Sequence, residues 1–179
     1  MAKVQDVANF FIDIENTKPE GNITNMKLNK LMYFAQGLHL ARYGTPLFDE
    51  EIQAWQYGPV VPSVYRKYNS HSALPIINTD EDYDFNVFTD EELEILIDVE
   101  RTYGIYEASA LVSLTHQKDT PWYKVYVEME KRPIIEGDMK EYFSKVLPMI
   151  ELPTPEKISV LPQEWYDPED DKAWGGYAT

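Results

Sequence analysis

Hydrophobic positions near the start of the chain recur with the period of an α-helix. The stripe falls at i, i+3, i+4, i+7 and i+10, on Val4, Val7, Ala8, Phe11 and Ile14. Pro19 and Gly21 end this first helix. A second helix is predicted from Thr24, a favourable N-cap, to Gly44, a glycine placed for the C-terminal cap. From Leu31 onward apolar residues occur on nearly every side of it, which predicts a buried central helix.

The period changes after the second helix. Residues 51–57 alternate polar and apolar side chains, which is typical of a strand, and Gly58 with Pro59 predicts a turn after it. Residues 85–88 are the predicted partner strand. Between the two, residues 62–68 suit a short helix with a proline in its first turn.

Helical signals return after the second predicted strand. Thr89 and Glu92 form a capping box. The helix that they open is expected to end at Gly104 and to turn four apolar residues inward: Leu93, Leu96, Ile97 and Tyr103. Three more helices are predicted, over residues 107–116, from about Pro121 and from about Asp138.

Residues 148–179 differ in composition from the rest. Five of the 12 prolines lie there, and from Glu151 onward the segment has seven acids and two bases. It also holds large aromatic side chains that a purely inert tail does not need: Trp165, Tyr166, Trp174 and Tyr177. The sequence therefore predicts a single helix-dominated α+β domain over residues 1–150, mainly α with a small antiparallel β element. Residues 151–179 are predicted to form an extended C-terminal arm.

The 179-residue chain is strongly acidic, with 16 basic and 31 acidic residues and a formal net charge of -15. Residues 1–70 carry seven of each, so the whole excess lies in residues 71–179. Nucleic acids are bound mainly through cations on phosphates, and anionic membranes attract basic segments, so this balance argues against both partners. An acidic field favours fast encounter with a basic protein, although many soluble proteins are acidic simply because that keeps them apart.

Composition also limits the chemistry and the location of the protein. The chain contains no cysteine, which excludes disulfides, thiol catalysis and cysteine-ligated metals. Its longest apolar stretch is far shorter than the roughly 18 residues of a membrane span, and the N-terminus lacks the apolar core of a secretory signal. We therefore expect a soluble, cytoplasmic protein that does not associate with membranes.

Sequence motifs of enzyme chemistry are missing, among them phosphate-binding glycine loops, H-E-x-x-H and G-x-S-x-G. His39 lies within an apolar helix, which is more typical of a hydrogen-bonded core residue than of a ligand. His116 ends a predicted helix, where a histidine interacts favourably with the negative helix end. No catalytic residue, metal ligand or cofactor is predicted. The enzymatic alternative is a hydrolase that uses acids with His39 or His116 as the base.

One segment is richer in large side chains than a core needs. Residues 55–62 read Trp-Gln-Tyr-Gly-Pro-Val-Val-Pro, with aromatics beside a turn and prolines that stiffen its exit. Tryptophan and tyrosine often dominate the energy of interfaces. The predicted partner-binding residues are therefore Trp55, Tyr57, Pro59 and Val60, together with Trp165, Tyr166 and Trp174 of the arm. The alternatives are that the strand aromatics cover the central helix and that the arm aromatics fasten the arm to its own domain.

Three blocks in a fixed order carry a family resemblance. Residues 27–40 read Lys-Leu-Asn-Lys-Leu-Met-Tyr-Phe-Ala-Gln-Gly-Leu-His-Leu, residues 46–65 include the Trp-Gln-Tyr-Gly-Pro segment, and Leu-Thr-His-Gln at 114–117 is followed by Pro-Trp at 121–122. Over about residues 1–147 the chain resembles the Panacea family, the SocA-like antitoxins of bacteria and prophages. Asn29 stands where the family more usually has glutamine, and Tyr-Glu-Ala-Ser after Ile105 differs from the family's common start of that helix.

The resemblance implies an intracellular, mostly helical domain that neutralises a partner protein toxin by direct binding. One branch of the family acts as an adaptor that delivers its toxin to an ATP-dependent protease. Toxin partners in the family are varied, so the resemblance supplies a role and not a target. We expect acids within residues 80–100 or 164–171 to steer a basic partner. The alternative is a phage- or prophage-encoded regulator or adaptor that binds a host protein without catalysis.

Overall fold

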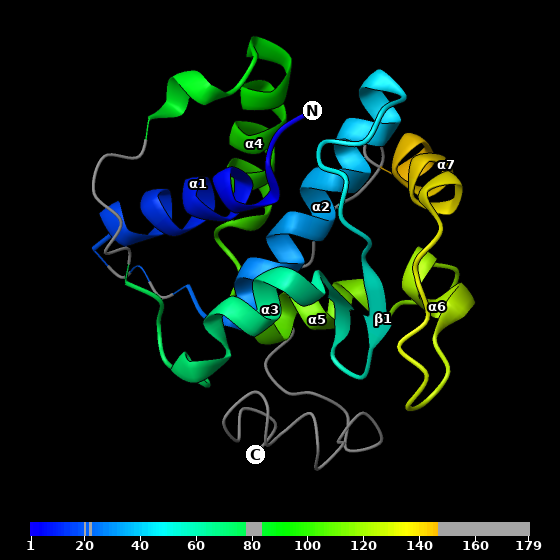
Figure 1. The fold of residues 1–179 in the computed structure, drawn as a ribbon. Helices are drawn as coiled ribbons and strands as arrows, with labels where there is room; N and C mark the ends of the chain where they lie inside the picture. Colours follow the sequence, from blue (N-terminus) through cyan, green and yellow to red (C-terminus); the bar gives the residue numbers. More distant parts are fainter. Residues whose placement is uncertain (20, 22, 78–83, 147–179) are drawn as a thin grey trace.

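Helices dominate the computed structural model, which describes residues 1–19, 21, 23–77 and 84–146 (Figure 1). In chain order the helices are α1 (Val4–Thr17), α2 (Asn25–Tyr43), α3 (Pro62–Tyr68), α4 (Asp90–Tyr103), α5 (Ala108–Thr115), α6 (Pro121–Val125) and α7 (Glu136–Val146). In this part of the chain, β1 (Gln53–Trp55) pairs with β2 (Gly58–Val60) in antiparallel orientation. The predicted fold class, mainly α with a small antiparallel element, is confirmed. The predicted arm, residues 151–179, lies outside the described residues.

Helix α2 runs between α1 and α7 (Figure 1) and is buried from Asn25 to Leu40. Thr24 caps it as predicted, because its side chain accepts a hydrogen bond from the main-chain N–H of Lys27 at 3.2 Å. Gly44 ends it with a φ of 75°, which favours glycine. The helix packs against α1, α3, α4, α5, α7 and β2, which explains why it is apolar on nearly every side. No helix in the described part of the chain is long and apolar enough to cross a membrane.

The close approach of α7 to α2 depends on Gly37. A Cβ atom at this position would lie 2.1 Å from Cε2 of Phe143, inside the volume of the ring. The Phe143 ring is buried and meets the ring of Tyr33 edge-on, with centroids 5.5 Å apart. Phe34 stacks on Tyr103 of α4 with centroids 3.9 Å apart. Aromatic pairs from α2 therefore fix both α7 and α4 around the central helix.

The small sheet differs from the sequence prediction. β1 pairs with β2, with Trp55 opposite Gly58, so Gly58 and Pro59 belong to a strand and not to a turn. Residues 85–88, the predicted partner strand, instead contain a 3₁₀ turn (Phe85–Val87). The physical reason lies in Gly58, whose φ of 102° lets the chain reverse immediately after β1 and pair with itself.

Helix α4 begins with the predicted capping box. The main-chain N–H of Glu92 donates to Thr89 Oγ1 at 3.2 Å, and the main-chain N–H of Thr89 donates to Glu92 Oε2 at 3.0 Å. The prediction for its inward face is wrong for Ile97, which is 41% exposed, whereas Leu93 is half-buried and packs against the core. The buried apolar residues of α4 are Ile95, Leu96, Val99 and Tyr103. A helix turned onto this face leaves the side chain at position 97 on the outside.

Candidate functional site

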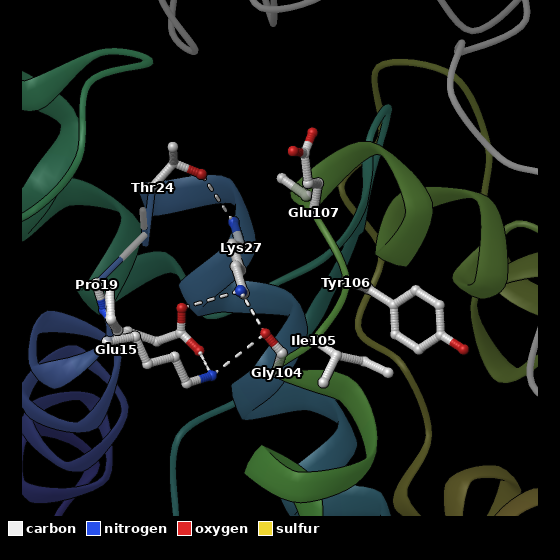
Figure 2. Close-up of a pocket in the computed structure, with 10 residues that line it drawn as sticks. Glu15, Pro19, Thr24, Lys27, Gly104, Ile105, Tyr106 and Glu107 are labelled. Atoms are coloured by element: carbon white, nitrogen blue, oxygen red, sulfur yellow. Dashed lines mark hydrogen bonds and ion pairs between the residues drawn. The ribbon is translucent and has the colours of Figure 1, made fainter. Parts of the chain in front are cut away.

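A cleft of about 890 Å³ opens where the end of α1, the start of α2 and the connection between α4 and α5 meet (Figure 2). Glu15 and Lys18 line it from the α1 side, Thr24 and Lys27 from α2, and residues 104–108 from the connection. Two segments that follow each other in the sequence, the end of α1 and the start of α2, therefore form one concave surface with a distant third, the α4–α5 connection.

Lys27 lies at the floor of the cleft as a buried cation. Its Nζ donates to Glu15 Oε2 at 3.0 Å and to the main-chain oxygen of Gly104 at 2.8 Å. Only 8% of the Lys27 side chain is exposed. A buried ammonium group is tolerated when its hydrogen-bond donors are used. Lys27 thus ties α1 and the α4–α5 connection to the first turn of α2.

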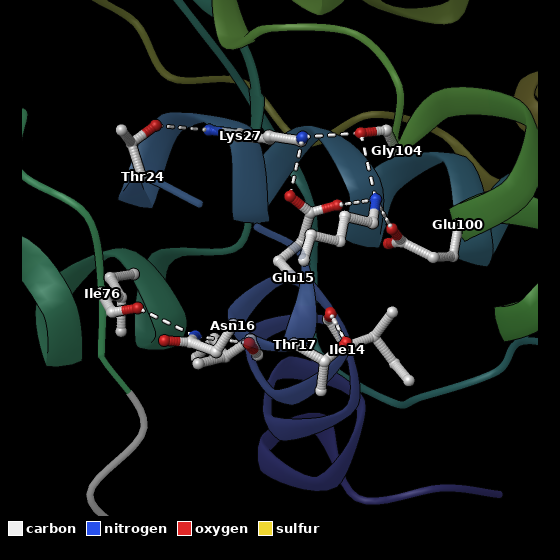
Figure 3. Close-up of polar contacts among 11 residues, drawn as sticks. Ile14, Glu15, Asn16, Thr17, Thr24, Lys27, Ile76, Glu100 and Gly104 are labelled. Atoms are coloured by element: carbon white, nitrogen blue, oxygen red, sulfur yellow. Dashed lines mark hydrogen bonds and ion pairs between the residues drawn. The ribbon is translucent and has the colours of Figure 1, made fainter. Parts of the chain in front are cut away.

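Lys18 joins the same network from the rim. Its Nζ donates to Glu15 Oε1 at 2.6 Å and to Glu100 Oε1, and it lies 3.5 Å from the main-chain oxygen of Gly104. Glu15, Glu100 and Gly104 lie close together in Figure 3. Glu15 therefore bridges two lysines, and both lysines face the Gly104 carbonyl. Position 104 has no room for a side chain, because a Cβ there would lie 2.3 Å from Glu100 Oε1.

Burial and close contact set the protonation of the two carboxyl groups. Burial, together with a hydrogen bond to Glu15, raises the pKa of Glu100 to about 7. Burial also acts to raise the pKa of Glu15, but hydrogen bonds with Glu100, Lys18 and Lys27 outweigh it and lower that pKa. At neutral pH the network thus holds an ionised Glu15 between two lysines, next to a Glu100 that is close to its titration midpoint.

The mouth of the cleft has a different character from its floor. Ile105 is 63% exposed, whereas the neighbouring Tyr106 is buried. Glu107 occupies the N-cap position of α5, but its side chain makes no capping hydrogen bond and the residue is exposed. An exposed apolar side chain and a carboxylate at the rim, above a fixed polar floor, are suited to contact a polypeptide segment.

The partner-binding residues predicted in the hairpin are buried, as in the alternative in which the strand aromatics cover the central helix. Trp55, Tyr57 and Val60 expose no more than 6% of their area, and Pro59 is buried as well. Trp55, Tyr57 and Val60 pack in one cluster with residues of α2, α3 and α5, namely Met26, Tyr65, Ala108 and Val112. Large apolar side chains of the strands stabilise the fold more when they cover the start of α2 than when they face solvent. Because Ala108 also lines the cleft, this cluster supports one of its walls, and direct contact of these side chains with a partner stays a prediction.

The remaining predicted contact residues are in the arm. Trp165, Tyr166 and Trp174 lie outside the described residues, as do the acids within residues 164–171. Their contribution to partner binding therefore stays a prediction too.

A second buried lysine follows Lys27 by one turn of α2. Lys30 is fully buried, and its Nζ donates to the main-chain oxygen of Pro59 at 3.2 Å. A Cβ at Gly58 would lie 2.8 Å from Lys30 Cε, so the glycine lets β2 come close to the lysine stem. Sequence reasoning did not single out either lysine. The available signal was two lysines, three residues apart, in a helix whose other side chains are mostly apolar.

The two histidines considered as catalytic bases have structural contacts. His39 is buried, with Nδ1 2.6 Å from the main-chain oxygen of Thr45. His116 ends α5 and places Nδ1 2.7 Å from Val112 O and Nε2 2.8 Å from Gln56 O. Burial lowers the pKa of His116 to about 4, although the two carbonyls oppose this. Such contacts favour a structural role for both rings. Among the described residues, no group of three or more His, Asp or Glu is placed to hold a metal ion.

Comparison with known protein families assigns this helical domain to one of them. Residues 28–123, from α2 into α6, match the family model "Antitoxin SocA-like, Panacea domain". The chain belongs to this family, which confirms the resemblance seen in the three sequence blocks. The matched region contains Lys30, the β hairpin and the α4–α5 side of the cleft.

A curated relative gives the family a named protein. Antitoxin SocA from Caulobacter vibrioides (strain NA1000 / CB15N) is 36% identical to the chain over 109 residues. The aligned part covers 56% of this chain and 58% of the relative, so the chain spans less than two thirds of that protein's length. No solved structure matches the chain.

Proposed function

We propose that this protein is an antitoxin that neutralises a partner protein toxin by direct binding. Membership of the SocA-like family supports the antitoxin role. The observation that supports direct binding is the cleft of about 890 Å³ with Ile105 exposed at its rim. Concave surfaces with an apolar contact and a few fixed polar groups are typical of sites that receive another molecule.

In the proposed complex, a segment of the toxin lies in the cleft and contacts Ile105 and Glu107. The floor beneath it is held by the bonds of Lys18 and Lys27 to Glu15 and to the Gly104 carbonyl. A surface that is already fixed before binding loses little conformational freedom when the partner arrives, which favours affinity. The toxin is neutralised because its active surface is covered.

The charge of the chain supports a basic toxin as the partner. The net charge is -15, and the acidic excess lies entirely in residues 71–179. Such a field speeds encounter with a positively charged protein and makes the association rate depend on salt. The aromatic residues of the arm extend the proposed contact beyond the cleft.

The candidate toxin is the product of the gene next to the one that encodes this chain. Growth of cells that express this candidate toxin tests the proposal. Co-expression of this chain is expected to restore growth, and the two proteins are expected to co-purify. Ile105→Glu should weaken capture of the toxin by about tenfold or more, because an apolar contact is replaced by a charge. Leu74→Glu is the matched control, since Leu74 is 68% exposed and lies outside the cleft.

Two outcomes would contradict the proposal. If co-expression neither restores growth nor yields co-purification with the toxin, the proposed antitoxin mechanism is refuted. If Ile105→Glu captures the toxin as well as wild type does, the cleft is not the site that binds the toxin. Adding an ATP-dependent protease to the purified complex separates simple occlusion from an adaptor role, because only an adaptor accelerates toxin degradation. Capture of a host protein in place of a toxin would support the regulator alternative.

A further inference from the structure

The outer face of α4 carries a second, shallower groove of about 360 Å³ that is separate from the cleft. It is lined by residues that recur along one side of this helix: Asp90, Leu93, Glu94, Ile97, Asp98 and Arg101. Leu93 and Ile97 lie one turn apart and form its apolar seam, and Ile97 is 41% exposed. Apolar residues at this spacing, with charges on both sides, are the pattern that one helix offers to another.

The acids beside the seam are held in position by α2. Arg42 Nη1 donates to Glu94 Oε1 and to Asp98 Oδ2, each at 2.8 Å, and the Tyr43 hydroxyl donates to Glu94 Oε2 at 3.0 Å. The side chains of Glu94 and Asp98 nevertheless stay 55% and 34% exposed. A carboxylate has about four acceptor positions, so each keeps room for a donor that arrives from solvent.

The balance of charge selects the kind of partner. Accessible acids on and beside the groove outnumber the two arginines there, since the acids are Asp90, Glu91, Glu94 and Asp98 and the bases are Arg42 and Arg101. A partner with acids beside its apolar stripe would meet like charge here. A partner with lysines or arginines there would meet carboxylates that are already fixed, which lowers the ordering cost of binding.

We propose that the α4 groove receives a basic amphipathic helix of the partner protein. Two apolar side chains of that helix pack on Leu93 and Ile97, and its lysines or arginines pair with Glu94 and Asp98. This inference rests on the proposed function for the source of the helix, the toxin, and adds a second contact surface to the cleft.

The probe is a fluorescently labelled peptide of about 14 residues with leucines on one helical face and lysines on the other. Its affinity for the full chain is measured by fluorescence anisotropy at about 50 mM salt, where surface charges are weakly screened. Ile97→Ser removes the seam. The pair Glu94→Gln with Asp98→Asn removes two charges but keeps the shape of the side chains and acceptors for Arg42.

The control pair is Glu128→Gln with Glu130→Gln, which changes the net charge equally at exposed positions after α6. Glu130, like Glu94, pairs with an arginine, Arg132. We expect Ile97→Ser and the α4 pair each to raise the Kd about tenfold, and the control pair to change it less than about twofold. Circular dichroism of each variant verifies that it is folded.

Equal weakening by the two charge pairs would show that the attraction is general and would overturn the inference. An unchanged Kd for Ile97→Ser would overturn it too. Toxin capture by the same variants separates the two proposals. If wild type captures the toxin and both α4 variants do so equally well, only the groove is refuted. If wild type captures no toxin, the proposed function itself fails.

Discussion

Replacing Lys27 by methionine removes the cation under the cleft and nearly preserves the length and volume of the side chain. The change deletes the bond to Glu15 Oε2 at 3.0 Å and the bond to Gly104 O at 2.8 Å. Breaking a buried ion pair costs about 3–5 kcal/mol when the remaining charge has no partner. Here Lys18 still bonds Glu15 at 2.6 Å and lies 3.5 Å from the same carbonyl. We therefore expect Lys27→Met to lower the free energy of unfolding by about 2–4 kcal/mol.

Urea denaturation followed by circular dichroism measures this loss. For a chain of this size the melting temperature should also fall, by about 2–4 °C for each kcal/mol. Lys145→Met is the matched control, since its pair with Glu141 at 2.6 Å is exposed and should contribute little to stability. In a double-mutant cycle, Glu15→Gln should cost much less once Lys27 is absent. The reasoning is refuted if Lys27→Met and Lys145→Met cost the same, or if the Lys27 and Glu15 changes simply add.

Three further changes test other parts of the structure. Glu100→Gln removes a carboxyl group whose pKa is raised to about 7 in the folded state. In the wild type, the contribution of this group to stability is present below the pKa of the unfolded state and is lost as the pH rises through 7. The unfolding free energy of wild type minus that of Glu100→Gln should therefore fall as the pH rises from about 5 to 8, and a constant difference would contradict this. Gly37→Ala places a Cβ 2.1 Å from Phe143 and should lower the free energy of unfolding, measured by urea denaturation, by about 1–3 kcal/mol. An unchanged stability would contradict this. Trp55→Ala should lower the free energy of unfolding by about 3–5 kcal/mol, because the Trp55 side chain is buried. Weaker toxin capture at unchanged stability would show that Trp55 acts at the partner surface instead.

Local signals in the sequence were sufficient for the helices. Thr24 and Gly44 bound α2 as predicted, because capping depends on the few residues that form each end. The capping box of Thr89 was likewise predictable from residues 89–92 alone. The rotation of α4 was not, since the side on which Ile97 falls depends on what packs against the helix.

The hairpin shows why strand pairing was harder to predict. A period of two identified residues 51–57 as a strand, but it did not say which segment would pair with it. The conformation of Gly58 made a local partner available and displaced the distant one. A glycine–proline pair predicts a turn because both residues are common in turns, yet here both belong to β2.

The candidate site was the least predictable part. Lys18 and Glu100 are 82 positions apart, and only the packing of α1 and α4 around α2 brings them together. Trp55 and Tyr57 carried a composition typical of interfaces, but composition does not separate an interface aromatic from a core aromatic. The family was recognisable because its blocks keep their order along the chain, independently of which side chains are exposed.

Calorimetric titration of the purified chain with its purified toxin tests the central claim most directly. The account predicts a saturable complex with a Kd below about 1 μM, weakened by Ile105→Glu and left intact by Leu74→Glu. Rescue of growth by a chain that forms no complex with the toxin in this titration would contradict it.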